Sequence, residues 1–318
     1  VAGDLTIDTD VTIAMDTHLL TVTNITDIDG ALAVAGDTLT LDGTSDIDGT
    51  ITISTGTVDA NGAFDATNGT ITFTDAGNLR LDSTVTSLGT LSDNFGTVTY
   101  DGVDQVVFSD VYYNLTSGGG SGTKTLGGTV TVAGVFTVDT LVTTAMEGNN
   151  LTVTDETDIN GTITISTATL DANGAFDATG GFITFTDAGN LRLDSTVTSL
   201  GTLSDNFGTV TYDGVDQVVF SDVYYNLTAG GGSGIKTLAG AVTVAGDLTI
   251  DTDVTIAMDT HDLTVTNATD IDGTLAVADN TLTLDGASDI DGTITISTGT
   301  VDANGTFDAT SGFVTFTD

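Results

Sequence analysis

The sequence contains no cysteine, proline or tryptophan, and its 318 residues include only four Lys or Arg and two His. Without cysteine, no disulfide can contribute to stability. The scarcity of basic residues argues against nucleic-acid binding and against anionic membrane surfaces, since both interactions need Lys or Arg. No apolar run approaches the roughly 20 residues of a transmembrane helix, so we expect no membrane insertion.

Aspartate dominates the charge that is present. The chain has 45 acidic residues and a formal net charge of −41, and only Glu147 and Glu156 are glutamates. A hydrophobic fraction of 39% is nevertheless too high for a disordered acidic tail, which cannot bury enough apolar surface to offset chain entropy. Abundant Asp with little Lys also suits a saline surrounding. The composition indicates a folded, highly acidic protein.

The sequence repeats itself over long distances. Val1–Asp75 recurs as Val244–Asp318, with 10 differences in 75 positions. Ile71–Thr116 recurs without change as Ile183–Thr228. These copies define super-repeats over about 1–131, 132–243 and 244–318, which we interpret as one continuous array over 1–318. Val1 and Asp318 both fall inside a repeat, so we expect the sequence to be an excerpt of a longer chain.

A shorter unit, of about 19 residues, lies within the super-repeat. The motif Asp-Ile-Asp-Gly begins at Asp27 and again at Asp46, and the pair recurs from Asp270 and Asp289. The middle super-repeat has only one related motif, Asp158-Ile159-Asn160-Gly161, and is shorter by one such unit. A unit that can be lost whole while its flanks stay intact is one that contacts only its neighbours.

Short alternating segments such as Leu20–Val22 and Leu39–Leu41 recur in register within this unit. Alternation with a period of two, β-branched residues and Gly, Asp or Asn at the ends predict strands of about three to five residues joined by tight turns. We therefore predict an all-β fold, a β-solenoid with about 19 residues per coil and about 16 coils. The predicted core includes Val22, Leu41, Ile53 and Phe73, with Thr outside.

Two segments depart from the regular repeat pattern. Residues 75–116 and their copy 187–228 carry most of the aromatic residues, and we expect longer, irregular coils there. The glycine-rich run Gly118–Gly122 follows the first of them, and we expect it to form a flexible outward loop.

The pattern resembles known surface proteins. Thr-, Gly- and Asp-rich units with Leu-Thr-Val and Ile-Thr-Ile strands resemble the repeats of filamentous-haemagglutinin-type bacterial adhesins. Segments such as Gly96–Gly102 followed by Tyr112–Thr116 are similar to repeats of giant bacterial or archaeal surface proteins. This resemblance implies a right-handed β-helix that is exported to the cell surface.

The paired aspartates are the candidate metal ligands. Stacked one coil apart, at about 4.8 Å, they would repel by roughly 1 kcal/mol per pair even at the dielectric constant of water. Ca²⁺, which prefers oxygen ligands, would relieve that repulsion, and so would screening by salt. No cofactor is required by the sequence, and Ca²⁺ is the one that it allows. The candidate ligands are Asp27, Asp29, Asp46, Asp48, Asp270, Asp272, Asp289 and Asp291.

Nothing in the sequence indicates catalysis. His18 and His261 occupy one repeat position, where the middle copy has Asn149, and we interpret both as exposed loop residues. Carboxylates are too widespread to single out an acid pair, so a polysaccharide-active enzyme is the weakest alternative. We predict that the protein is not an enzyme.

The prediction for function is a structural or adhesive extracellular solenoid, forming a surface filament, stalk or adhesin. Its expected partners are other copies of itself, in a filament or bundle, and a cell-surface or glycan ligand. The leading alternative is an ice-binding solenoid, because the outward pairs Thr21/Thr23, Thr50/Thr52 and Thr72/Thr74 could form a flat face.

Overall fold

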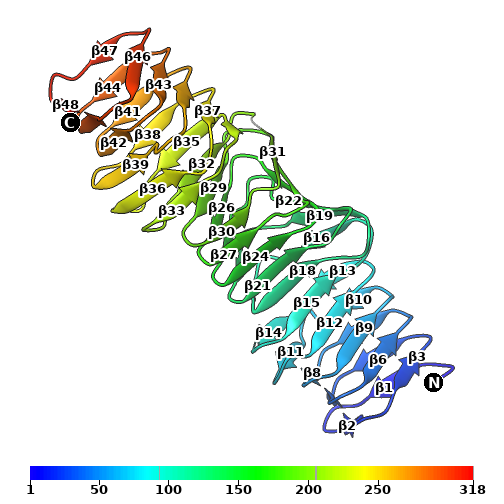
Figure 1. Cartoon of the computed structure of the whole chain (residues 1–318). Helices are drawn as coiled ribbons and strands as arrows, with labels where there is room; N and C mark the ends of the chain where they lie inside the picture. The colour runs from blue at the N-terminus through cyan, green and yellow to red at the C-terminus, as the bar shows by residue number, and fades with distance from the viewer. Residues whose placement is uncertain (93, 205, 318) are drawn as a thin grey trace. The chain divides into compact units, whose positions relative to one another are not determined.

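The computed structural model describes residues 1–92, 94–204 and 206–317 (Figure 1). The chain divides into two compact units, Val1–Ile163 and Thr164–Asp318, and each is described by itself. The described residues form 48 short strands and no helix, so they include no helix that could span a membrane.

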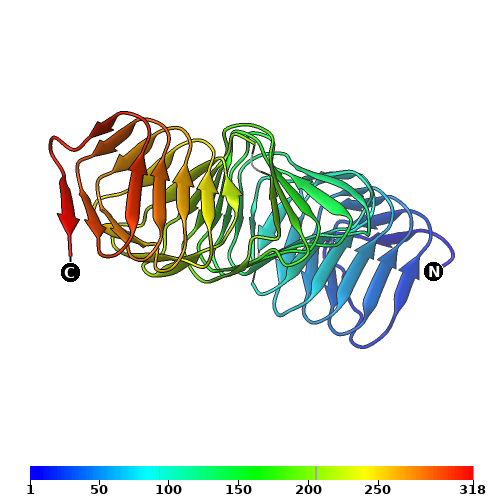
Figure 2. The same cartoon turned by 45° about the horizontal axis from the view of Figure 1, so that its top comes forward.

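Three successive strands make one coil, and every fourth strand lies beside the first. In this way β1 (Leu5–Ile7) pairs in parallel with β4 (Thr26–Ile28), and the same step of three recurs along the chain. Three strands per coil give about 16 coils in the described residues. Figure 2 shows the strands of each coil in the first unit stacking on those of the next. The predicted β-solenoid is confirmed.

In the unit Val1–Ile163 the strands fall into three columns. The first column contains β1, β4, β7 (Ser45–Ile47), β10 (Phe64–Asp65), β13 (Val85–Ser87), β16 (Gln105–Val107), β19 (Gly122–Leu126) and β22 (Val142–Ala145). The second contains β2 (Thr12–Ala14), β5 (Ala31–Val34), β8 (Thr50–Ile53), β11 (Thr70–Phe73), β14 (Thr90–Ser92), β17 (Val111–Tyr112), β20 (Val130–Val132) and β23 (Leu151–Val153). The third contains β3 (Leu20–Val22), β6 (Thr38–Leu41), β9 (Thr57–Ala60), β12 (Asn78–Leu81), β15 (Thr97–Tyr100), β18 (Asn114–Ser117), β21 (Val135–Val138) and β24 (Glu156–Ile159).

The unit Thr164–Asp318 has the same organisation, and β25 (Thr162–Ile165) crosses the boundary. One column contains β26 (Thr169–Ala172), β29 (Asn190–Leu193), β32 (Thr209–Tyr212), β35 (Asn226–Ala229), β38 (Leu248–Ile250), β41 (Thr269–Ile271), β44 (Ser288–Ile290) and β47 (Phe307–Asp308). The next contains β27 (Ala175–Asp177), β30 (Val197–Ser199), β33 (Gln217–Val219), β36 (Gly234–Leu238), β39 (Val254–Ala257), β42 (Thr274–Val277), β45 (Thr293–Ile296) and β48 (Phe313–Phe316). The last contains β28 (Phe182–Phe185), β31 (Thr202–Ser204), β34 (Val223–Tyr224), β37 (Val242–Val244), β40 (Leu263–Val265), β43 (Thr281–Leu284) and β46 (Thr300–Ala303).

The core of the first unit lies inside its coils. Val22, Leu41, Ile53 and Phe73 are each 0% exposed, as predicted. Between inward residues the outward positions are mostly Thr or Asp, because successive side chains of a strand point to opposite faces. Burial of aliphatic side chains from every coil, at roughly 25 cal/mol per Å² of apolar surface, is the main stabilising contribution.

Coil length varies around the predicted repeat. Leu20 pairs with Leu39, at the predicted spacing, whereas Leu5 pairs with Thr26, so the first coil is longer. Thr97 pairs with Asn114, which makes this coil shorter than the predicted repeat. The prediction of longer coils in residues 75–116 is therefore wrong for this coil, which is shorter than its neighbours.

The predicted loop at Gly118–Gly122 covers residues 118–121 only, between β18 and β19. Gly122 already belongs to β19, and the preceding glycines form a tight turn against the previous coil. The φ of Gly122 is +94°, and a Cβ there would lie 1.6 Å from the Val103 carbonyl oxygen. Glycine is required because the backbones of two coils meet closely and because L residues avoid this conformation.

Candidate functional sites

The aspartate ladder has the predicted register. Asp27 of β4 lies beside Asp46 of β7, and Asp46 lies beside Asp65 of β10. Asp29 and Asp48 follow the ends of their strands, in exposed turns. Sequence reasoning missed Asp65 because its coil has Phe-Asp in place of the repeated motif, although the regular spacing from Asp27 to Asp46 points to it.

The carboxylates of the ladder influence one another. Burial raises the pKa of Asp46, and the negative charges of Asp48, Asp65, Asp27 and Asp29 raise it further, in that order. These repulsions are the ones that stacking predicts.

The second ladder repeats the arrangement in the other unit. Asp270 of β41 lies beside Asp289 of β44, which lies beside Asp308 of β47. Asp272 and Asp291 follow the ends of their strands, in exposed turns. Burial raises the pKa of Asp270, and Asp272, Asp289 and other carboxylates add to the increase.

Neither ladder forms a compact cluster of ligands. In the described part of the chain, no three acidic or histidine side chains are grouped so that they could hold a metal ion. Calcium binding by neighbouring carboxylate pairs stays a prediction.

The histidines lie in turns. His18 is exposed, and its Nδ1 lies 3.3 Å from the carbonyl oxygen of Met15. His261 is half-buried, and its backbone N–H donates to Met258. The imidazole of His18 is thus placed beside a backbone carbonyl of its own turn.

The threonine pairs form a short array. Thr50 and Thr52 of β8 lie beside Thr70 and Thr72 of β11, and the next strand continues with Thr90 and Ser92. Towards the N-terminus the same column carries Ala31 and Ala33 instead. Thr23 and Thr74, which belong to two of the predicted pairs, lie just beyond the ends of their strands.

An interruption of two sheets is the least regular feature of the first unit. β13 pairs with β10 and ends its sheet, while β16 pairs with β19 and begins another. In the neighbouring column β14 ends one sheet and β17 begins the next. The third column is continuous through β12, β15 and β18. The two coils are therefore joined on one side and separated on the other two.

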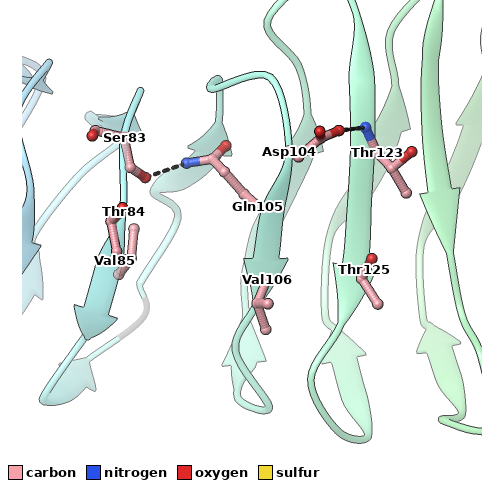
Figure 3. Close-up of a pocket in the computed structure, with 8 residues that line it drawn as sticks. All are labelled: Ser83, Thr84, Val85, Asp104, Gln105, Val106, Thr123 and Thr125. Carbon is pink, nitrogen blue, oxygen red and sulfur yellow. Dashed lines mark hydrogen bonds between the residues drawn. The ribbon is translucent and has the colours of Figure 1, made fainter.

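A cavity of about 530 Å³ occupies the separation between β13 and β16. Its lining consists of residues 83–85, residues 104–106, Thr123 and Thr125. Figure 3 shows the two strands on either side of an open gap, with β19 running directly beside β16. The second unit has the same interruption between β30 and β33, with a cavity of about 440 Å³.

Gln105 links the two coils at the inner end of the gap. Its Nε2 donates to the carbonyl oxygens of Leu81 and Ser83, at 2.7 and 2.9 Å, and its Oε1 accepts from the Gly102 N–H at 2.8 Å. The side chain replaces backbone partners that a continuous ladder would supply. Gln217 makes the equivalent three hydrogen bonds in the other unit.

Lys124 is fully buried beneath the turn at Gly102 and Val103, which precedes β16. Its Nζ donates to the carbonyl oxygens of Gly102 and Val103. Burial lowers the pKa of Lys124, and the opposing effect of Asp101, Asp104 and Asp82 is smaller. The buried ammonium thus holds the turn that precedes β16, and Lys236 does the same in the second unit.

A tyrosine pair fills the interior of the short coil. The hydroxyl groups of Tyr100 and Tyr112 lie 3.0 Å apart. Tyr112 donates to the Phe108 carbonyl at 2.9 Å, and the Phe108 N–H donates to the Tyr100 hydroxyl at 3.1 Å. Burial raises the pKa of Tyr100 to about 12. Tyr212 and Tyr224 repeat the pair in the second unit.

Acidic residues and one arginine lie in and just after strands β12 and β15 of the third column, next to the short coil. Arg80 forms an ion pair with Asp101, and its Nε lies 4.0 Å from Asp59. Burial raises the pKa of Asp82, and the Asp101 charge raises it further. The sequence showed that Arg80 and Lys124 recur, but it offered no reason for their presence.

The chain was compared with protein-family models, with curated proteins and with solved structures, and it matches none of them.

Proposed function

We propose that this chain is structural or adhesive material of an extracellular β-solenoid, in a surface filament, stalk or adhesin. The observation that carries the proposal is that each coil pairs only with the coils before and after it, around an apolar interior. A fold of this kind gains length coil by coil without any change of the core. Such a protein works through its length and its repeated surface.

The loss of one repeat unit from the middle super-repeat supports this proposal. In the first unit, the repeat unit that the middle super-repeat lacks forms one complete coil, because Ala31, Leu32 and Val34 pair with residues one repeat unit later. Removal of a complete coil preserves the register of all later strands. Variation in coil number is therefore tolerated, as expected where length is the useful property.

The outward surface supports an exported, highly hydrated role. Asp and Thr fill the outward positions, and the formal net charge is −41. Repulsion between such chains keeps them apart at low salt, and screening allows them to associate side by side. The resemblance to filamentous-haemagglutinin-type repeats supports a place at the cell surface and a right-handed coil.

Electron microscopy of the purified protein across a salt series tests the proposal. We expect separate particles at low ionic strength and bundles or filaments when NaCl or a divalent cation is added. Immunogold labelling of intact source cells with an antibody against residues 71–116 should mark the exterior. Particles that never associate, together with a label confined to the cell interior, would refute the proposal.

Ice binding is the second candidate, and the stacked pairs Thr50/Thr52 and Thr70/Thr72 are the observation that favours it. The array covers three coils if Thr90 and Ser92 are included, and Ala31 and Ala33 end it on one side. Thermal hysteresis that disappears in a T52D/T72D variant would establish this candidate. Activity unchanged by those substitutions would exclude this face.

A further inference from the structure

The gap between β13 and β16 leaves two strand edges without a neighbour. Phe64 N–H donates to the Thr84 carbonyl, so the backbone groups of Val85, which point the opposite way, face the gap. Gly127 N–H donates to the Val107 carbonyl, so those of Val106 face the gap from the other side. No ladder among the described residues joins the two strands. Unpaired edges of this kind are templates for another strand.

The same geometry recurs in the other unit. Phe176 N–H donates to the Thr196 carbonyl, and Ala239 N–H donates to the Val219 carbonyl. Val197 of β30 and Val218 of β33 therefore present their backbone groups to the second gap. The recurrence follows from the identical sequences of residues 71–116 and 183–228, so the chain carries two copies of the gap.

The gap is open to solvent and of suitable volume. Its cavity of about 530 Å³ falls within the range of roughly 300–1,000 Å³ that is usual for binding sites. Val106, at 53% exposed, lies on the accessible side, and the lining is otherwise made of Thr, Ser, Asp, Gln and Val85 side chains. A partner there would meet backbone donors and acceptors on both sides and mostly small side chains between them.

The charges around the gap are mainly negative. Asp104 is exposed at the end of the cavity, and its carboxylate accepts the Thr123 N–H at 2.9 Å. Asp82 and Asp101 lie nearby, close enough to act on the same buried lysine, Lys124. With Asp59 included, four carboxylates stand against the Lys124 ammonium and the Arg80 guanidinium, and the remaining negative charge favours a cationic partner. It disfavours a strand from a second copy of this acidic chain.

We propose that each gap binds an extended, Lys- or Arg-containing segment of another protein, which adds a strand between the two unpaired edges. Its backbone hydrogen-bonds to Val85 on one side and Val106 on the other, which restores a continuous sheet. The chain then carries two such sites, one in each unit. The sites add a peptide-binding activity to the filament role and do not depend on it.

The two sites differ at one lining position. Thr123 in the first gap corresponds to Ile235 in the second, which is 49% exposed. All other lining residues are the same in both copies. The second site therefore prefers a segment with an apolar residue at the facing position, and the two sites bind one peptide with different affinity.

Isothermal titration calorimetry with the full chain and the peptide Lys-Val-Thr-Val-Thr-Val-Lys tests the proposal. We expect two peptides per chain. V106P removes a donor that faces the gap and leaves the β16–β19 ladder intact, so it should reduce the stoichiometry to one, and V106P/V218P to none. V106T is the matched control, because it changes the side chain and keeps the backbone donor. Equal melting temperatures verify that the variants fold.

A second experiment uses altered peptides and unaltered protein. N-methylation of alternate residues blocks one edge of the peptide. Because both edges are used, methylation of either alternate set should weaken binding by about tenfold or more. If only one set matters, the peptide pairs with one strand, and the insertion proposal is wrong. Equal binding of the fully methylated peptide would show attraction to the net charge alone, which contradicts the proposal. Absence of any binding would also overturn it.

Discussion

Replacement of Tyr112 by Phe measures the contribution of the tyrosine pair. Both hydroxyl groups are buried with their rings, and Tyr112 is hydrogen-bonded to Tyr100 and to the Phe108 carbonyl. The substitution keeps the ring, so it leaves no large cavity. It removes one hydroxyl and deprives two buried groups of a partner.

The expected loss of unfolding free energy is about 2 kcal/mol, because a buried polar group without a partner costs about 1–3 kcal/mol. Tyr112→Ala should cost more, about 3–5 kcal/mol, because it also creates a cavity. The matched control is Tyr113→Phe. Tyr113 is the half-buried neighbour whose ring packs against Phe95 at 5.0 Å, and we expect a change within about 0.5 kcal/mol.

Urea unfolding followed by circular dichroism provides the measurement, with the same m-value required for all variants. Because each coil contacts only its neighbours, the coils around Tyr112 can unfold separately, and amide hydrogen exchange of residues 97–117 reports on them directly. A Tyr112→Phe protein as stable as the wild type, or a Tyr113→Phe protein equally destabilised, would refute the hydrogen-bonded pair.

Three further predictions concern titration and calcium. Burial raises the pKa of four carboxyl groups above the ordinary value of 3.8, namely Asp46, Asp82, Asp139 and Asp270. A carboxyl group whose pKa is higher in the folded state stabilises the fold at low pH, and this stabilisation is lost as the pH rises through the folded-state pKa. The melting temperature at constant ionic strength should therefore increase as the pH is lowered from 7 to about 4, the region of the ordinary carboxyl pKa, and a decrease would contradict this. The pKa of Tyr100 and of Tyr212 is about 12, so at pH 11 absorbance at 295 nm should show both still protonated; their ionisation below pH 11 would mean that water reaches them. If the ladders bind Ca²⁺, a free Ca²⁺ concentration of about 100 times the dissociation constant should raise the free energy of unfolding by about 2.7 kcal/mol. Chelation should remove this gain. D46N should reduce that gain. D75N is the control and should not reduce it, because Asp75 is exposed in a turn outside the ladders. A melting curve unaffected by calcium would leave salt screening as the explanation.

Much of the fold could be predicted because periodicity is a local property of the sequence. The repeat spacing placed Leu20 beside Leu39, and alternation placed Val22 and Leu41 inside. It also placed Asp27 beside Asp46. The same alternation puts Lys124 on the side of Leu126, so an inward lysine could have been recognised.

The interruption between β13 and β16 could not be predicted in this way. It depends on how two neighbouring coils separate, and the short strand sequences Val-Thr-Ser and Gln-Val-Val carry no sign of that separation. The loop at 118–121 could be predicted from its glycine-rich composition, but the role of Gly122 could not, because its close approach to the Val103 carbonyl depends on the neighbouring coil. The metal prediction could not be decided from the repeat pattern, since register alone does not fix the position of a carboxylate oxygen.

Deletion of one complete coil is the most direct test of the central claim that each coil is a modular unit. Removal of residues 31–49 joins Gly30 to Thr50 and recreates the order found naturally at Gly161–Thr162. The control removes residues 31–40, which is about half a coil and shifts every later strand out of register. We expect the complete-coil deletion to melt cooperatively within about 5 °C of the wild type, and the half-coil deletion to melt far lower. Equal damage by both deletions, or tolerance of both, would contradict the account.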